Sequence, residues 1–286
     1  MALRGLPFVG TWYSDLNGAV QLTAYPTHGL PDHLDLSRVE AARFRLPISR
    51  LQLGSLEGIE PRDVLDLFHR SPSELCFLRV PAGSERWTAD LIGDDVTALP
   101  ADFLIYFGRP LDDVVAERAR WLAGRQDEDE LVASVRSTFA DYSNHYRSNP
   151  LLAAQDCEEG YVEWCASHLH TDDAAVALLR SEDGSISAFG AVTVAGTTGE
   201  IALAGVSPDH RGRGVYDDLL ATLEHQVREM GADEIVISTQ GWNTAPMRAW
   251  SRRAYRPLSA FSTLHLFRGD CRRQLLAIAD ERRSLR

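Results

Sequence analysis

The alternation of hydrophobic and polar positions along the chain predicts short strands and amphipathic helices. Near the start, Asn17-Gly18 separates two apolar segments and is a two-residue hairpin signal. Further on, Pro61 lies in the first turn of a helix with Val64 and Phe68 on its apolar side. Helical and strand patterns alternate, so we expect a small α/β unit in this part. Its other predicted elements are strands at 8–16, 19–25, 48–53, 74–80 and 101–107 and a weak helix at 36–46.

The second part follows a polar run at 125–130, which we interpret as the junction between a domain over 1–126 and one over 127–286. A helical stripe from Leu131 to Tyr142 opens it and ends near Asn149-Pro150. The order after that is helix, three strands, helix, strand, helix, a last strand or hairpin, and a helical tail. These elements are predicted at 156–165, 174–179, 186–194, 200–206, 214–230, 234–239, from 243 or 244, 255–267 and 270–286.

The most informative segment is the apolar run 200–206, which stops at Pro208 and leads through Arg211-Gly212-Arg213-Gly214 into a helix. Such a turn is suited to phosphate, because unpaired N–H groups and the helix dipole attract anions. The glycines let the backbone approach the anion, and the arginines add charged donors. A dinucleotide fingerprint would need glycine where Asp217 stands, and a nucleotide P-loop would need a lysine, which the chain lacks.

Composition narrows the range of functions. The net charge of −12 argues against nucleic acid or an anionic membrane as a partner, since both require a basic face. All 29 basic residues are arginine, which excludes a catalytic-lysine mechanism. The four cysteines have no metal-ligand spacing, so we expect no metal and a reducing compartment. With no apolar run of about 20 residues and no signal-peptide core, we expect a cytoplasmic protein.

The turn at 211–216 resembles the coenzyme A pyrophosphate loop of the GNAT acetyltransferase superfamily, whose order of elements is similar to that of residues 128–268. Thr239-Gln240, Asn243-Thr244-Ala245 and the aromatic last strand resemble the dTDP-fucosamine acetyltransferase branch. The resemblance implies a C-terminal GNAT fold, in which helices flank a central mixed sheet, with a smaller N-terminal α/β domain. It also implies that acetyl-CoA or another acyl-CoA donates to the amino group of a small molecule, with an amino sugar nucleotide as the leading acceptor.

By this resemblance, the strand 200–206 holds the pantetheine arm in a gap where the next strand splays away. Backbone groups of Ala204 and Val206 would pair with that arm, and the Ala204 N–H would stabilise the oxyanion. Asn243 would bond the same arm. The further residues that the resemblance places at the cofactor are Gly205, Arg211, Gly212, Arg213, Gly214, Val215 and Tyr216.

Glu200 matches the position of a general-base glutamate in one branch of the family. It lies about 13 Å from Ala204 along an extended strand, so it would act through a water or on a substrate that reaches toward it. A solvated residue at the start of the strand is an equal alternative. His168 and His170 are weaker candidates for the base.

Two residues depart from the family pattern. Tyr216 stands where a small residue normally lets the helix approach the phosphates. Trp250 stands at the position of the general-acid tyrosine, and an indole N–H cannot serve as a proton source. Coenzyme A can leave as the thiolate, and Tyr255 and Ser251 are the alternative acids.

We expect the acceptor between the first two helices of the second part and the last strands. Two other functions stay open: an acyl-CoA-binding protein with little or no turnover, and an acetyltransferase for an aminoglycoside or an amino-acid-derived metabolite. A homodimer is also left open. The candidate acceptor contacts are Tyr142, His145, Tyr146, Asn149 and Phe261.

Overall fold

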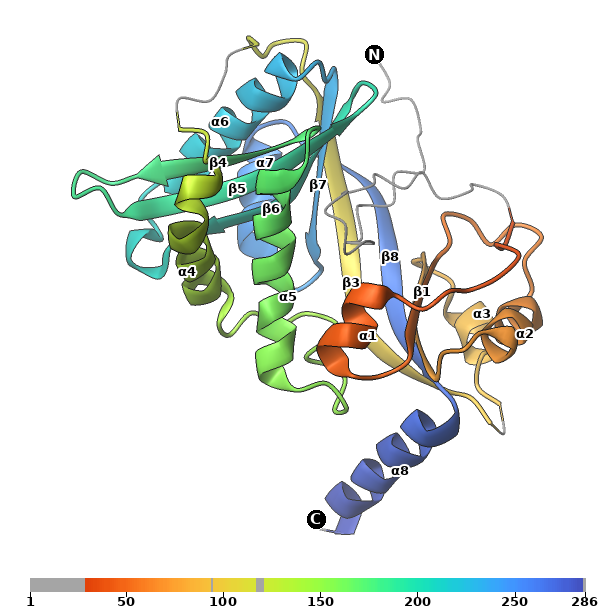
Figure 1. The fold of residues 1–286 in the computed structure, drawn as a ribbon. Helices are drawn as coiled ribbons and strands as arrows, with labels where there is room; N and C mark the ends of the chain where they lie inside the picture. Colours follow the sequence, from red (N-terminus) through yellow and green to blue (C-terminus); the bar gives the residue numbers. More distant parts are fainter. Residues whose placement is uncertain (1–28, 94, 117–120, 285–286) are drawn as a thin grey trace.

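The computed structural model describes residues 29–284 apart from 94 and 117–120, and it centres on a sheet of eight strands. The strand order is β1-β2-β8-β3-β7-β6-β5-β4. The β1–β2 and β6–β7 pairs are parallel, and all other neighbouring pairs in this sheet are antiparallel. Helices lie on both faces of this mixed sheet (Figure 1), which confirms the predicted fold class. The hairpin predicted over 8–25 lies outside the described residues.

The strands agree with the predicted ones in number and order from residue 48 onward, but β3 is longer than predicted. It extends on both sides of 101–107, because its pairing with β8 continues past a bulge near Pro100. The last strand is a single strand rather than a hairpin. The strand bounds are β1 Ile48–Gln52, β2 Leu75–Pro81, β3 Thr97–Pro110, β4 Ala174–Arg180, β5 Ile186–Ala195, β6 Thr198–Val206, β7 Glu234–Gln240 and β8 Arg256–Phe267.

Most helices follow the predicted stripes, but the helix that was expected to end near Asn149-Pro150 ends at Phe139, because the polar residues that follow it favour turns. The short helix α3 was not predicted, because five residues give too little periodicity to detect. The helix bounds are α1 Arg38–Phe44, α2 Pro61–Arg70, α3 Glu85–Ala89, α4 Glu128–Phe139, α5 Ala154–Ser167, α6 Val215–Glu229, α7 Thr244–Arg252 and α8 Gly269–Ser284. Short 3-10 turns are η1 Arg125–Asp127, η2 His168–His170 and η3 Pro208–His210.

Strand β3 joins the first part of the chain to the second. It lies between β7 and β8 and pairs with both, for example through Leu104 with Gln240 on one side and Phe261 on the other. The predicted boundary between residues 126 and 127 falls after this strand. The strands on the two sides of that position therefore share one sheet.

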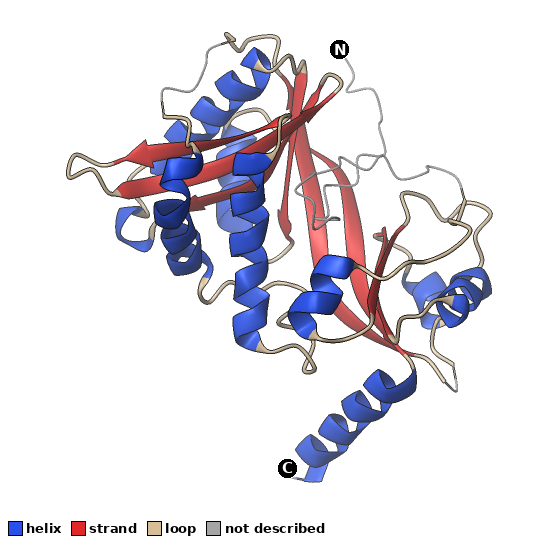
Figure 2. Ribbon diagram, in the orientation of Figure 1, coloured by secondary structure: helices blue, strands red, loops and turns tan. Residues whose placement is uncertain are grey.

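The helices of the second part pack on opposite faces of the sheet (Figure 2). On one face, Leu219 and Leu223 of α6 and Trp250 of α7 are buried with Ile201 and Ile237. The other face carries α4 and α5, whose buried residues pack on β4, β5 and β6. That second cluster is formed by Leu131, Val135, Phe139, Val162, Cys165, Val176, Leu178, Ile186, Phe189, Ala191 and Leu203. The sheet is thus covered on both sides around β6.

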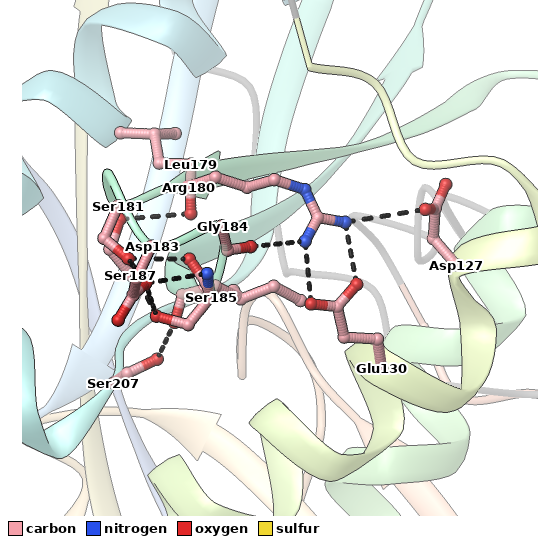
Figure 3. A network of polar contacts seen from close by, with 11 residues as sticks. Asp127, Glu130, Leu179, Arg180, Ser181, Asp183, Gly184, Ser185, Ser187 and Ser207 are labelled. Carbon is pink, nitrogen blue, oxygen red and sulfur yellow. Dashed lines mark hydrogen bonds and ion pairs between the residues drawn. The ribbon is translucent and has the colours of Figure 1, made fainter.

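A polar network ties the start of α4 to the β4–β5 hairpin (Figure 3). The Arg180 guanidinium binds both carboxylate oxygens of Glu130 at 2.7 Å and the Gly184 carbonyl at 2.9 Å. Nearby, the Ser207 hydroxyl donates to the Ile186 carbonyl at 2.6 Å. Ser207 follows β6 directly, so this bond fixes the point where the chain leaves the sheet for the glycine-rich turn.

Gly199 marks a close approach of α6 to β6, and it generates a prediction about stability. A Cβ atom at Gly199 would lie 2.9 Å from the Cβ of Val227, which is closer than ordinary contact. Gly199→Ala should lower the free energy of unfolding by about 1–3 kcal/mol in urea titrations, because a packed helix cannot yield without strain. Gly93→Ala is the control, since a Cβ there meets only Asp95 at 3.8 Å; equal loss in both variants would contradict this reading.

Candidate functional site

The site begins at an opening in the sheet between β6 and β7. These parallel strands pair only from Thr198–Glu234 to Ile201–Ile237, although β6 continues to Val206 and β7 to Gln240. On its other side, β6 pairs with Val192 at Ile201 and with Ala191 at Leu203, so Ala202 is a bulged residue. Bulges bend and twist a strand. The bulge therefore stands where the two strands part.

Alternation along β6 decides which backbone groups face this opening. The Ser207 N–H donates to the Ser187 carbonyl at 3.0 Å, on the β5 side. In an antiparallel pair the direction alternates from residue to residue. Ala204 and Val206 thus turn their N–H and C=O groups toward the opening, where β7 no longer supplies partners.

A cavity of about 760 Å³ occupies the opening and extends across the sheet. Its walls come from β6, β7 and the turn before α6, and also from α4, α7 and the strands of the first part. Of the residues predicted at the cofactor, those that line it are Ala204, Gly205, Val206, Arg211, Gly212, Gly214, Val215, Tyr216 and Asn243. Arg213 is exposed and lies outside the lining. Glu200 lines the cavity and is buried rather than solvated.

The turn before α6 has the backbone of an anion site. Gly212 and Gly214 adopt φ values of +75° and +82°, a conformation that residues with a Cβ rarely adopt. Gly214 is the N-cap of α6, and no side chain caps the helix, so the first N–H groups stay available. Arg211 donates to the carbonyls of Val206 at 3.3 Å and Thr138 at 3.1 Å, which holds the turn against the end of α4.

One acid lies at the same helix start. Asp217 lines the cavity in the first turn of α6, where its charge opposes an incoming anion. Arg252 of α7 pairs with it at 3.2 Å. This pairing offsets the charge of Asp217 beside the turn.

Asn243 belongs to a hydrogen-bonded group at the end of β7. Its amide nitrogen donates to the Thr239 hydroxyl at 2.9 Å and to the Tyr142 hydroxyl at 3.2 Å. Tyr142 in turn donates to the Gln240 side chain. These bonds anchor the tyrosine over the opening, where it also contacts the rings of Phe139, Tyr161 and Trp242.

Tyr216 and Trp250 form a pair inside the cavity wall. Trp250 is 1% exposed and packs on Phe107 with ring centroids 5.3 Å apart. Its indole Nε1 donates to the Tyr216 hydroxyl at 3.0 Å. Burial raises the pKa of Tyr216, and the bond from Trp250 opposes that rise. The side chain of Tyr216 is therefore turned inward to the cavity, and a phenol stands next to the position where the family pattern has its tyrosine.

The alternative acids and bases lie elsewhere. Ser251 donates to the Met247 carbonyl and is exposed, and Tyr255 is buried outside the lining. His168 is buried, and burial lowers its pKa to about 4. His170 pairs with Glu128 at 3.0 Å. None of these four side chains is among the cavity-lining residues.

The predicted acceptor contacts divide into two groups. Tyr142, His145 and Tyr146 line the cavity. Asn149 is 1% exposed and outside the lining, and its amide nitrogen donates to Nδ1 of His265 at 2.9 Å. Phe261 packs on Tyr106 at 5.7 Å between ring centroids and is not in the lining.

Strands of the first part contribute polar side chains that were missed from the sequence. Arg50, Arg79 and Asp102 line the cavity from β1, β2 and β3. A signal was present, because Arg79 and Asp102 are charges within stretches read as apolar strands. Its meaning was hidden, since the sequence does not show that these strands adjoin β7 and β8.

Known proteins resemble part of this chain. Residues 139–255 match the sequence model of the acetyltransferase (GNAT) family. A mycothiol acetyltransferase from Clavibacter sepedonicus is 33% identical over 131 residues, which cover 46% of this chain and 40% of that protein. This chain therefore aligns with less than half of the relative.

A solved structure shares the fold over most of this chain. A functionally unknown conserved protein from Staphylococcus epidermidis shares it with a TM-score of 0.50 and 13% identity, over 85% of this chain and 94% of that one. A GCN5-related N-acetyltransferase from Sphaerobacter thermophilus has a TM-score of 0.47 and 18% identity, over 72% and 64% of the two chains. The match to the GNAT family therefore covers residues 139–255, and the mixed sheet flanked by helices in this part of the chain is consistent with a GNAT fold.

Two further properties bear on the site. No cluster of three or more potential metal-ligating side chains occurs among the described residues. Across the same residues, the helices are too short or too polar to cross a membrane.

Proposed function

We propose that the cavity between β6 and β7 binds an acyl-CoA, with acetyl-CoA as the leading donor, and transfers the acyl group to an amine of a small molecule. The observation that carries this proposal is the edge of β6 at 202–206 that β7 does not pair with, which leads into the glycine turn before α6. An open strand edge offers amide pairing to an extended arm, and the turn offers N–H groups to a pyrophosphate. The family match and the relative named as an acetyltransferase support the same donor.

The residues of the chain fit this donor in three places. Ala204 and Val206 present backbone groups to the pantetheine arm, Asn243 lies across the opening from them, and Gly212 and Gly214 let the turn approach the phosphates. The N–H of Ala204 is the oxyanion donor of the proposal. The amine nitrogen attacks the thioester carbonyl carbon, so a C–N bond forms as the C–S bond breaks.

Tyr216 supplies the proton donor for the departing sulfur in this proposal. Its hydroxyl oxygen accepts from Trp250, so its own proton is free to point away from the indole. A phenol can donate where the indole at position 250 cannot. Trp250 thus acts as a positioning residue. In the family pattern the proton-donating tyrosine is at the position of Trp250 on α7, whereas here the proton donor is Tyr216 on α6.

The acceptor is a small molecule with an amino group, and an amino sugar nucleotide remains our leading class. Aromatic rings of Tyr142, Tyr161 and Trp242 on one wall and polar side chains on the other suit a ring that carries polar groups. Aminoglycosides and amino-acid-derived metabolites share these features. We place the reaction in the cytoplasm, with no metal.

Calorimetry with acetyl-CoA tests the binding half of the proposal. Gly214→Ala should raise the Kd at least tenfold, since a methyl group strains the turn and blocks the approach of phosphate. Gly184→Ala is a matched control, because Gly184 has a φ of +86° in a hairpin remote from the cavity. Absence of acetyl-CoA binding to the wild-type protein, or equal loss in both variants, would contradict the proposal.

Thiol release from acetyl-CoA tests the catalytic half, with a panel of primary amines that includes dTDP-amino sugars. The best amine should release thiol well above hydrolysis. With that amine, Tyr216→Phe should lower kcat about 100-fold or more while the Kd for acetyl-CoA stays within a factor of two. Tyr255→Phe controls for the loss of a buried tyrosine hydroxyl and should retain kcat. Binding without release by any amine would instead support a non-catalytic acyl-CoA-binding protein.

A further inference from the structure

A row of polar residues crosses the strands of the first part on the cavity side. Gln52 of β1 is opposite Arg79 of β2, Arg79 is opposite Thr263 of β8, and Thr263 is opposite Asp102 of β3. Residues opposite each other in a sheet share a face. Arg79 and Asp102 line the cavity, so the row runs along its wall. The interior of a sheet normally carries apolar residues, and this row requires an explanation.

Asp102 is the member of the row that most clearly lacks hydrogen-bond partners. Both of its carboxylate oxygens are buried and make no hydrogen bond of good geometry in the structure. The amide atoms of Gln52 are likewise buried without a partner. A buried polar group without a partner costs about 1–3 kcal/mol, and more when charged. Packing alone does not account for a carboxylate in this position.

A second buried carboxylate, that of Glu40, shows how this protein satisfies an acid that serves its structure. Glu40 is fully buried, and Arg50 binds both of its oxygens at 2.6 Å. The Tyr146 hydroxyl donates to it as well, also at 2.6 Å. Asp102 has no comparable set of hydrogen-bond donors. Burial raises the pKa of Asp102, while the charge of Arg79 and the nearby side chains of Thr263 and Gln240 oppose that rise.

We infer that Asp102 binds the primary ammonium group of the acceptor, so that β3 supplies the acceptor site and β6 the donor site of one cavity. This inference rests on the proposed function. An ammonium brings a positive charge and three N–H donors to a carboxylate whose two oxygens lack hydrogen-bond partners. The acceptor class is therefore a primary amine that is protonated in solution, bound from the side of the sheet that the first part of the chain builds.

The same contact gives the acceptor nitrogen a route to its reactive form. The ammonium passes one proton to Asp102 and becomes a neutral amine, whose lone pair attacks the thioester carbon. As the C–N bond forms and the C–S bond breaks, Tyr216 protonates the departing sulfur, and the second proton that leaves the nitrogen restores the Tyr216 phenol through solvent. Asp102 then releases its proton to solvent. A raised pKa favours this role, because it brings the carboxylate closer to the basicity of an amine.

Ligand-observed NMR with ethanolammonium tests the inference without a known acceptor. The protein is saturated with coenzyme A, and ethylene glycol serves as the neutral probe of similar size. Wild-type protein should bind ethanolammonium more tightly than ethylene glycol. Asp102→Asn should weaken ethanolammonium at least tenfold and leave ethylene glycol unchanged. Asp172→Asn is the matched control, because Asp172 is exposed and outside the cavity lining.

Each outcome of this experiment bears on Asp102. No preference for the cation, or equal binding by wild type and Asp102→Asn, would overturn the inference. If coenzyme A binds to every variant, such a failure concerns the acceptor site alone. If coenzyme A does not bind to the wild-type protein, the proposed function itself is wrong. In that case the NMR comparison is made on the unliganded protein with the same criteria.

Thermal unfolding guards against a variant that fails to fold. A carboxylate whose folded-state pKa is raised destabilises the fold at pH values above that pKa, and the cost disappears as the pH falls through it. Asp102→Asn should therefore unfold at a temperature equal to or above that of wild type at pH 8. A clear fall in that temperature would mean that Asp102 supports the structure, and it would count against a binding role.

Discussion

The divergence of β6 from β7 after Ile201 and Ile237 is the constraint on which the rest of the site depends. Two parallel strands that stayed paired would satisfy each other's backbone groups and leave no cavity. The bulge at Ala202 ends that pairing, and the strand then continues with Ala204 and Val206 open on one side. Ser207 fixes the end of the strand to β5, so the turn before α6 always starts from the same place.

The second wall of the cavity is formed by strands from the first part of the chain. Because β3 lies between β7 and β8, residues of the first hundred positions face helices that come much later in the sequence. The donor side of the proposed site is built from backbone groups and glycines. Its acceptor side is built from Arg79 of β2, Asp102 of β3 and the aromatic rings of Tyr142, Tyr161 and Trp242. This division suits an enzyme whose donor is constant and whose acceptor must be selected.

Much of the fold was predictable, because helices such as α6 carry a regular stripe of Leu219, Leu223 and Val227 that faces the core. The glycine turn was also predictable, since Gly212 and Gly214 have a backbone conformation that few other residues allow. The bond between Trp250 and Tyr216 was not, because it joins two helices through side-chain directions. Asp102 was missed for a related reason: pairing partners 161 residues apart, such as Thr263, leave no local pattern.

Amide hydrogen exchange with and without acetyl-CoA reports directly on the proposed acyl-CoA site, because it follows the backbone N–H groups of β6 that β7 does not pair with. We expect slower exchange in two segments, 202–206 and 212–216, when acetyl-CoA is added, with the Ala204 and Val206 amides most affected where single residues are resolved. The hairpin at 181–185 should not change. Binding of acetyl-CoA without protection at 202–206, or with protection confined to other strands, would contradict the account.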